Sequence, residues 1–223
     1  MYYADEIACN PAHHCVGVAT SENILGPYTP HDTPLACPID QGGAIDADGF
    51  QDADGKRYVV YKVDGNSIGH GGECVNSVAP IVPTPIVLQA VAGDGVTPIG
   101  DPVEVLDRDT YDGPLIEAPS LYRTSESIYF LFFSSNCFTG PLYATSYATA
   151  TSLYGPYTKS ERPLFITGDG PDMCGPGGLD IVKDGSRVVL HGHLNDSMGY
   201  IGSRPRGMFT AQLTFSGITV SAR

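Results

Sequence analysis

The sequence contains no tryptophan and few basic residues. It has 12 Lys and Arg against 25 Asp and Glu, which gives a formal net charge of −13 at pH 7. Such a chain is repelled by nucleic acid phosphates and by anionic membrane surfaces, so we expect neither as a partner, whereas a neutral polymer remains compatible. No apolar run approaches the roughly 20 residues that cross a bilayer. Without tryptophan, ring contacts with a ligand have to come from Tyr, Phe or His.

Helical periodicity is also scarce. Short apolar runs alternate with turn residues, and the 223 residues include 27 Gly and 18 Pro. This pattern is typical of an all-β fold, and the length fits one domain covering residues 1–223.

Two internal repeats divide the chain. Ile45-Asp46-Ala47 aligns with Ile116-Glu117-Ala118, which makes Asp46 the counterpart of Glu117, and Gly178 takes the equivalent position in a third copy. Gly26-Pro27-Tyr28 recurs as Gly155-Pro156-Tyr157, at close to twice the spacing of the first repeat. Repeats of roughly 60–70 residues, built from short strands and turns, predict propeller blades.

The predicted blades are a remnant at 1–30 and three units at about 44–93, 94–160 and 161–223. The innermost strand of each blade runs beside the central axis. Asp46 and Glu117 are therefore expected to face one cavity from adjacent blades, and two facing carboxylates are what cleavage of a glycosidic bond requires.

The surroundings of Glu117 favour a proton donor. Leu115, Ile116 and Ala118 are apolar, and an ionised carboxylate among them loses hydration, which raises its pKa. The alternative is a glutamate at a strand edge that points to water. The repeated pattern favours the first interpretation.

Further candidates lie in the loops and strand ends that follow. Phe138 and Tyr143 could stack on a sugar ring, although an aromatic residue after a strand more often packs in the core. His191 ends a predicted strand, where a histidine is usually a satisfied polar residue and less often a binding one.

Six cysteines match no zinc spacing and suggest disulfides formed in an oxidising compartment; buried free thiols are the alternative. They allow 15 pairings, and their positions are Cys9, Cys15, Cys37, Cys74, Cys137 and Cys174. The sequon Asn195-Asp196-Ser197 is a weak further sign of secretion. We expect an extracellular protein, although Met1-Tyr2-Tyr3-Ala4-Asp5 is not a signal peptide and is interpreted as the end of a strand.

The ordered motifs resemble glycoside hydrolase family 43 over essentially the whole chain. The resemblance lies in Asp46 followed by Asp-x-Asp-Gly-Lys, in Glu117-Ala-Pro-Ser-Leu-Tyr, in the paired Gly-Pro-Tyr units and in Gly175-Pro176-Gly177. It implies a five-bladed β-propeller that hydrolyses arabinose- and xylose-containing polysaccharides or oligosaccharides with inversion. By the same resemblance Glu117 is the general acid, Asp46 tunes its pKa and Arg206 contacts the substrate.

Two departures from the family pattern matter. Many members carry a His after Gly-Pro-Gly, near a central water or calcium, whereas this chain has Gly178, so we expect no metal or other cofactor; His191 could reach the axis instead. The family's general base is an Asp of the first blade, and Asp5 does not match it. The propeller is therefore expected to be incomplete, without the first blade and part of the second, and without the base.

Three interpretations remain open from the sequence. The chain is an arabinofuranosidase- or β-xylosidase-like hydrolase in shortened form, or a catalytically silent carbohydrate-binding propeller, or another five-bladed sugar enzyme such as a fructan hydrolase or transferase, whose usual Trp-bearing motif is not visible. An incomplete propeller leaves a strand edge unpaired, so self-association is expected.

Overall fold

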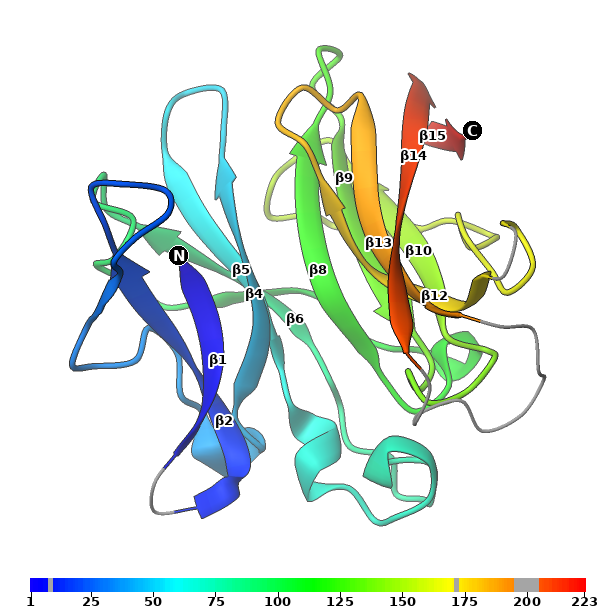
Figure 1. Cartoon of the computed structure of the whole chain (residues 1–223), viewed down its shortest axis with the longest axis horizontal. Helices are drawn as coiled ribbons and strands as arrows, with labels where there is room; N and C mark the ends of the chain where they lie inside the picture. The colour runs from blue at the N-terminus through cyan, green and yellow to red at the C-terminus, as the bar shows by residue number, and fades with distance from the viewer. Residues whose placement is uncertain (8–9, 171–172, 195–204) are drawn as a thin grey trace.

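The structure, a computed structural model, describes residues 1–7, 10–170, 173–194 and 205–223. Four antiparallel sheets are arranged side by side (Figure 1). Their strands are β1 (Tyr2–Ile7), β2 (Asn10–Thr20) and β3 (Thr29–Pro30); β4 (Ala44–Gln51), β5 (Arg57–Val63), β6 (Ile86–Val91) and β7 (Val103–Leu106); β8 (Ile116–Arg123), β9 (Tyr129–Ser135), β10 (Ala144–Ala150) and β11 (Thr158–Lys159); and β12 (Met173–Ile181), β13 (Arg187–Leu194), β14 (Arg206–Ser216) and β15 (Thr219–Ala222). Four short 3-10 helices lie between strands: η1 (Ile39–Gln41), η2 (Gly65–Ile68), η3 (Glu73–Val75) and η4 (Thr110–Asp112).

The all-β prediction is confirmed, and the sheets form a four-blade propeller arrangement. The described residues contain four sheets, so the five-blade prediction is not confirmed by them. One predicted boundary was wrong. β7 pairs with β6, so the second sheet continues past residue 93 to Leu106, and the segment from 94 onward does not all belong to the blade of Glu117.

The sheets are held together by hydrophobic cores between neighbouring blades. Alternate residues of the second strand of a blade face opposite neighbours, because side chains alternate along a strand. In β9, Leu131 and Phe133 pack toward the second sheet, whereas Phe130 and Phe132 pack toward the fourth. A strand buried on both faces needs an uninterrupted apolar run, which explains Ile128–Phe133.

The Gly-Pro-Tyr repeat is confirmed as a structural repeat. Gly26-Pro27 and Gly155-Pro156 are both cis peptide bonds, and each leads into a two-residue outer strand. The tyrosine hydroxyls donate to the carbonyls of Ile24 and Leu153, at 2.9 and 3.0 Å. Thr20 pairs with Thr29 and Thr149 with Thr158, so the two copies also agree in strand register.

The innermost strands of the last three sheets share a β-bulge. Register shifts occur between Ile45 and Asp48, between Glu117 and Ser120, and between Gly177 and Asp180. One residue in each bulge has a positive φ: Asp46 (57°), Ala118 (50°) and Gly178 (63°).

These bulges correct the predicted alignment of the repeats. By its place in the bulge, Asp46 matches Ala118, one position later than the predicted counterpart, and Ala118 in turn matches Gly178. The structural equivalent of Glu117 in β4 is therefore Ile45, and not Asp46 as the sequence alignment predicted.

Candidate active site

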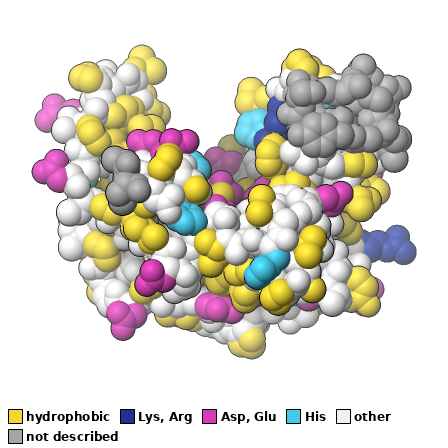
Figure 2. Space-filling model, turned by 90° about the horizontal axis from the view of Figure 1, so that it is seen from below, with side chains coloured by type: hydrophobic (Ala, Val, Ile, Leu, Met, Phe, Trp, Pro, Cys, Tyr) yellow, Lys and Arg dark blue, Asp and Glu magenta, His cyan; other side chains and the backbone are white. Residues whose placement is uncertain are grey.

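The three bulges surround a small cavity of about 230 Å³ on the axis between the sheets. Its walls are Asp46, Ala47, Asp48, Ala118, Pro119, Ser120, Gly178, Leu179 and Asp180. Figure 2 shows the molecule as two arms with a notch between them, and acidic side chains lie deep in that notch. Asp46 lines this cavity, whereas Glu117, which was predicted to face the same hollow, is not among its walls.

Asp46 links the second and third sheets. Its Oδ2 accepts a hydrogen bond from the backbone N–H of Ala118, at 3.0 Å. Burial, and then the negative charge of Glu117, raise the pKa of Asp46 to about 6, against the opposing charge of Lys62. Positive φ at Asp46 aims this carboxylate at the neighbouring bulge, a conformation in which Asp is among the tolerated residues.

A second acidic layer follows one step along the strands. The hydroxyl of Ser120 donates to Asp48 at 3.0 Å and lies 3.4 Å from Asp180. Burial, and then repulsion from Asp180, raise the pKa of Asp48 to about 6. Asp48 and Asp180 were not predicted as site residues, although each follows a residue of the predicted repeat, Asp46 or Gly178, by two positions.

Both carboxylate oxygens of Glu117 have a donor. The hydroxyl of Tyr143 donates to Oε1 at 2.6 Å, and Nζ of Lys62 donates to Oε2 at 3.2 Å. Lys62 is 0% exposed and also pairs with Asp64 at 3.0 Å. A buried ammonium is stable only with such partners.

Lys62 and Tyr143 were not predicted as partners of Glu117. The signal for Lys62 is a single cation inside the otherwise apolar run Tyr58–Val63 of β5, because lysine is almost never fully buried unless it is paired. Burial, and then the charge of Glu117, raise the pKa of Tyr143 well above its ordinary value, so its hydroxyl stays a donor.

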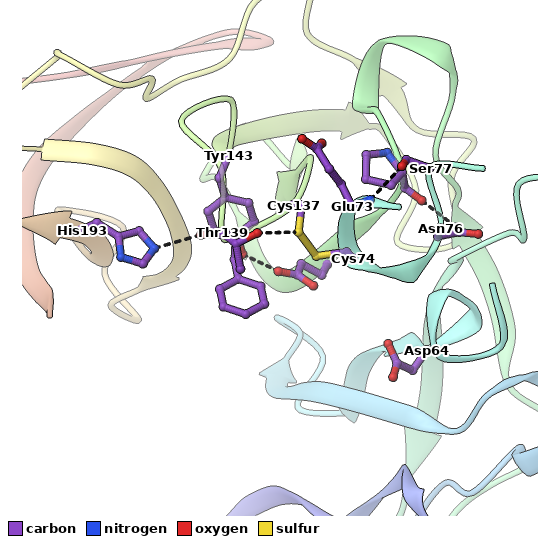
Figure 3. The surroundings of a disulfide bond; sticks show 12 residues. Asp64, Glu73, Cys74, Asn76, Ser77, Cys137, Thr139, Tyr143 and His193 are labelled. Atoms are coloured by element: carbon purple, nitrogen blue, oxygen red, sulfur yellow. Dashed lines mark hydrogen bonds between the residues drawn. A yellow bond between two sulfur atoms is a disulfide. The ribbon is translucent and has the colours of Figure 1, made fainter. Parts of the chain in front are cut away.

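A disulfide lies beside these groups (Figure 3). Cys74 of η3 bonds to Cys137 of the β9–β10 loop, and Nε2 of His193 donates to the carbonyl of Phe138 at 2.9 Å. Three sheets are thereby tied together next to Tyr143. The side chain of Phe138 is 41% exposed, which is compatible with the predicted ligand contact.

The remaining cysteines include a second disulfide. Cys15 and Cys37 form a second disulfide, the thiol of Cys174 is buried and unpaired among the described residues, and Cys9 and the sequon at Asn195 lie outside them. The disulfide prediction is therefore confirmed for four cysteines.

His191 and Arg206 lie on neighbouring strands of the fourth sheet. His191 pairs in register with Gly177, and burial and the charge of Arg206 lower its pKa. Arg206 is exposed at the start of β14. Neither forms an ion pair or hydrogen bond with Asp46 or Glu117 in the described ranges. The structure thus brings Asp46 and Glu117 together and leaves Arg206 at the surface.

The model of glycosyl hydrolases family 43 matches residues 1–210. The chain belongs to family 43. A search of curated proteins found no match.

Solved structures agree with the family. A thermostable family-43 glycoside hydrolase is 26% identical, with a TM-score of 0.79, and the match covers 100% of this chain and 70% of that one. An endo-1,4-β-xylanase from Bacteroides thetaiotaomicron is 21% identical, with a TM-score of 0.72 and coverage of 100% and 74%. An α-L-arabinofuranosidase from Lactobacillus brevis is 20% identical, with a TM-score of 0.68 and coverage of 98% and 67%.

Family 43 enzymes are glycoside hydrolases that generally need no cofactor. Across the described ranges, no three His, Cys, Asp or Glu side chains are grouped to hold a metal ion, and no helix is long and apolar enough to span a membrane. Inversion, the reaction course of the family, needs one carboxyl group that protonates the leaving oxygen and another that activates water from the opposite face.

Proposed function

We propose that this chain acts on arabinose- or xylose-containing polysaccharides or oligosaccharides, with Glu117 as the general acid and Asp46 as the carboxyl group that tunes it. The observation that supports this most is the pair itself: burial, and then the negative charge of Glu117 on the adjacent inner strand, raise the pKa of Asp46 to about 6. Two adjacent carboxylates resist joint ionisation, which is the effect by which Asp46 would tune the acid.

Phe138, His191 and Arg206 are the proposed substrate contacts. Phe138 presents an exposed ring in the β9–β10 loop, next to Cys137 of the disulfide, and His191 lies opposite the inner strand β12. Arg206 lies at the surface end of the same sheet and is proposed for outer units of a longer substrate. The general base was expected in a first blade, and no described residue is assigned to it.

A second candidate is a carbohydrate-binding propeller without turnover. It is favoured by the state of Glu117, whose two oxygens already accept from Lys62 and Tyr143. A general acid has to reach the leaving oxygen of the substrate, whereas both carboxylate oxygens of Glu117 are held by donors of the protein itself.

The test is hydrolysis of aryl α-L-arabinofuranoside and aryl β-D-xyloside, measured by the coloured phenol that the reaction releases. For any of these substrates that the parent chain turns over, we expect Glu117→Gln to lose about 10²–10⁴-fold of the rate, the usual contribution of an acid or base catalyst. Glu104→Gln, at an exposed position of β7, is the control and should match the parent. Measurable and equal activity in Glu117→Gln and Glu104→Gln removes Glu117 from the mechanism.

Calorimetry with xylo- and arabino-oligosaccharides separates the two candidates. Binding without turnover of any aryl glycoside or oligosaccharide supports the binding propeller. Absence of binding to every oligosaccharide contradicts both candidates.

We also propose an extracellular location and self-association. The two disulfides are typical of proteins that fold in an oxidising compartment. β1 is an edge strand of the first sheet, and an uncovered edge is a template for pairing with another chain. Light scattering should show a mass that rises with concentration, and a constant monomer mass would contradict the self-association.

A further inference from the structure

A second, much larger cavity lies to the side of the axial site. Its volume is about 1130 Å³, which exceeds the usual range of about 300–1,000 Å³ for small-molecule pockets. Its walls come from η4, from the β9–β10 loop and from the segment after β11. Ser135 of this wall pairs with Ile116, the residue before Glu117, so the cavity and Glu117 occupy the same end of the third sheet.

Tyr143 connects the large cavity with Glu117. The residue lines the large cavity, and its hydroxyl donates to Oε1 of Glu117 at 2.6 Å. The thickness of one side chain therefore separates the cavity from the proposed general acid.

Two large side chains on the wall have no packing role. Tyr111 is 94% exposed and Leu142 is 72% exposed. A single exposed apolar residue is ordinary, but here an aromatic and an aliphatic side chain border the same hollow. Tyrosine combines an apolar ring face with a hydroxyl, which suits the C–H face and the hydroxyls of a sugar ring.

The charges of the cavity exclude an acidic ligand. Its basic lining residue, Lys159, is already paired with Asp109 at 3.1 Å and with Asp112. Glu161 adds a further carboxylate, so the lining carries more negative than positive charge. Carboxylates accept hydrogen bonds and repel anions, so the hydroxyl groups of a neutral sugar fit this lining.

We propose that this cavity is an off-axis subsite for a neutral sugar unit of the same oligosaccharide whose reacting unit lies at Glu117, with Tyr111 as its stacking platform. The inference rests on the proposed function, because it assumes a sugar at the axial site. It adds a place where units beyond the reacting one are bound.

The experiment is calorimetry with short and long probes, xylobiose against xylohexaose and arabinobiose against arabinohexaose. All variants carry Glu117→Gln so that the probes are not consumed. We expect a hexasaccharide to bind at least about tenfold more tightly than its disaccharide. Tyr111→Ala should remove about three- to tenfold of that gain, as expected for loss of an aromatic contact, and leave disaccharide binding unchanged.

Two controls identify the stacking. Tyr111→Phe keeps the ring and should keep the gain. Tyr154→Ala removes a half-exposed tyrosine that lies outside the cavity, and it should leave the affinity for every probe unchanged. Equal affinity for both lengths, or a gain that survives Tyr111→Ala, overturns the subsite and leaves the proposed function standing. Absence of binding to all four probes counts against the proposed function and the subsite together.

Discussion

The inner strands β8 and β12 have the same bulged backbone, but they differ in the side chain that they carry at the position before the bulge. Where β8 carries Glu117, β12 carries Gly177 at the equivalent register position. A Cβ at Gly177 would lie 2.0 Å from Cε1 of Tyr143, so the ring of Tyr143 occupies the space that a side chain of β12 would fill. From that space its hydroxyl reaches Glu117. The absence of a side chain at Gly177 in the fourth sheet thus makes room for the Tyr143 ring that contacts Glu117 of the third sheet.

The residues opposite these positions differ in the same way. Lys62 faces Ile45, Ser134 faces Glu117 and His191 faces Gly177. A charged partner for Glu117 comes from the second sheet, and a neutral donor comes through the gap in the fourth. The repeated backbone brings equivalent positions of the three sheets to the axis. The different residues at those positions give the site its one carboxylate with a cationic and a neutral donor.

The largest effect is expected from Lys62→Met, which removes the cation that β5 supplies. Glu117 and Asp64 would then be buried without their counter-charge, and removal of one partner of a buried pair costs about 3–5 kcal/mol. Denaturant unfolding at neutral pH measures the loss. Lys56→Met removes a surface lysine paired with Asp54 and should leave stability unchanged. Equal midpoints for the two variants would show that Lys62 is not required by the acid pair.

Gly177→Ala tests the gap in β12 directly. The added methyl group meets the Tyr143 ring inside a packed site, and overpacking of this kind costs about 1–3 kcal/mol. Gly140→Ala is the control, because its Cβ meets only the carbonyl of Cys137 at 3.6 Å. If unfolding midpoints show Gly177→Ala to be as stable as Gly140→Ala, the ring of Tyr143 does not need the gap.

Tyr143→Phe keeps the ring and removes only the hydroxyl. Glu117 loses one donor and keeps Lys62, so the cost should lie at the lower end of the range for an unsatisfied buried acceptor, about 1 kcal/mol. The same unfolding assay measures it, with Tyr111→Phe as the control at an exposed position. A loss as large as that of Gly177→Ala would mean that the hydroxyl, and not the ring, dominates.

The smallest effect concerns pH and the second acidic layer. The pKa of Asp48 is raised to about 6 in the folded protein, from an ordinary value of 3.8. The folded state then binds the proton more tightly than the unfolded state, so the free energy of unfolding falls as pH rises from about 4 to about 6. Asp48→Asn should flatten this fall.

The matched control for Asp48→Asn is Asp101→Asn, at an exposed position away from the cavity. Unfolding midpoints at several pH values should follow the parent in Asp101→Asn and not in Asp48→Asn. Parallel curves for the two variants would contradict the buried charge at Asp48.

The sequence predicted the repeated framework well, because each strand and turn is specified locally. The Gly-Pro-Tyr units and the apolar strand Ile128–Phe133 needed no distant information. The alignment of Asp46 with Glu117 was wrong by one position. Similar triplets aligned with each other, whereas the real equivalence depends on where the bulge shifts register against the second strand.

The partners of Glu117 could not be predicted because they come from distant parts of the chain. Lys62 is 55 residues away and Tyr143 is 26 residues away. Nothing in either local pattern specifies which carboxylate a buried lysine meets. The gap at Gly177 looks like an ordinary flexible glycine until the ring of Tyr143 is placed against it.

The most direct test of the central claim is a titration of the protein carrying ¹³C-labelled carboxyl groups with xylotriose and arabinotriose, followed by NMR. We predict that the signals of Asp46 and Glu117 shift together along one binding curve for at least one of the two sugars, while that of Asp101 stays in place. A trisaccharide that binds without moving either signal would show that the acid pair is not the sugar site of this protein.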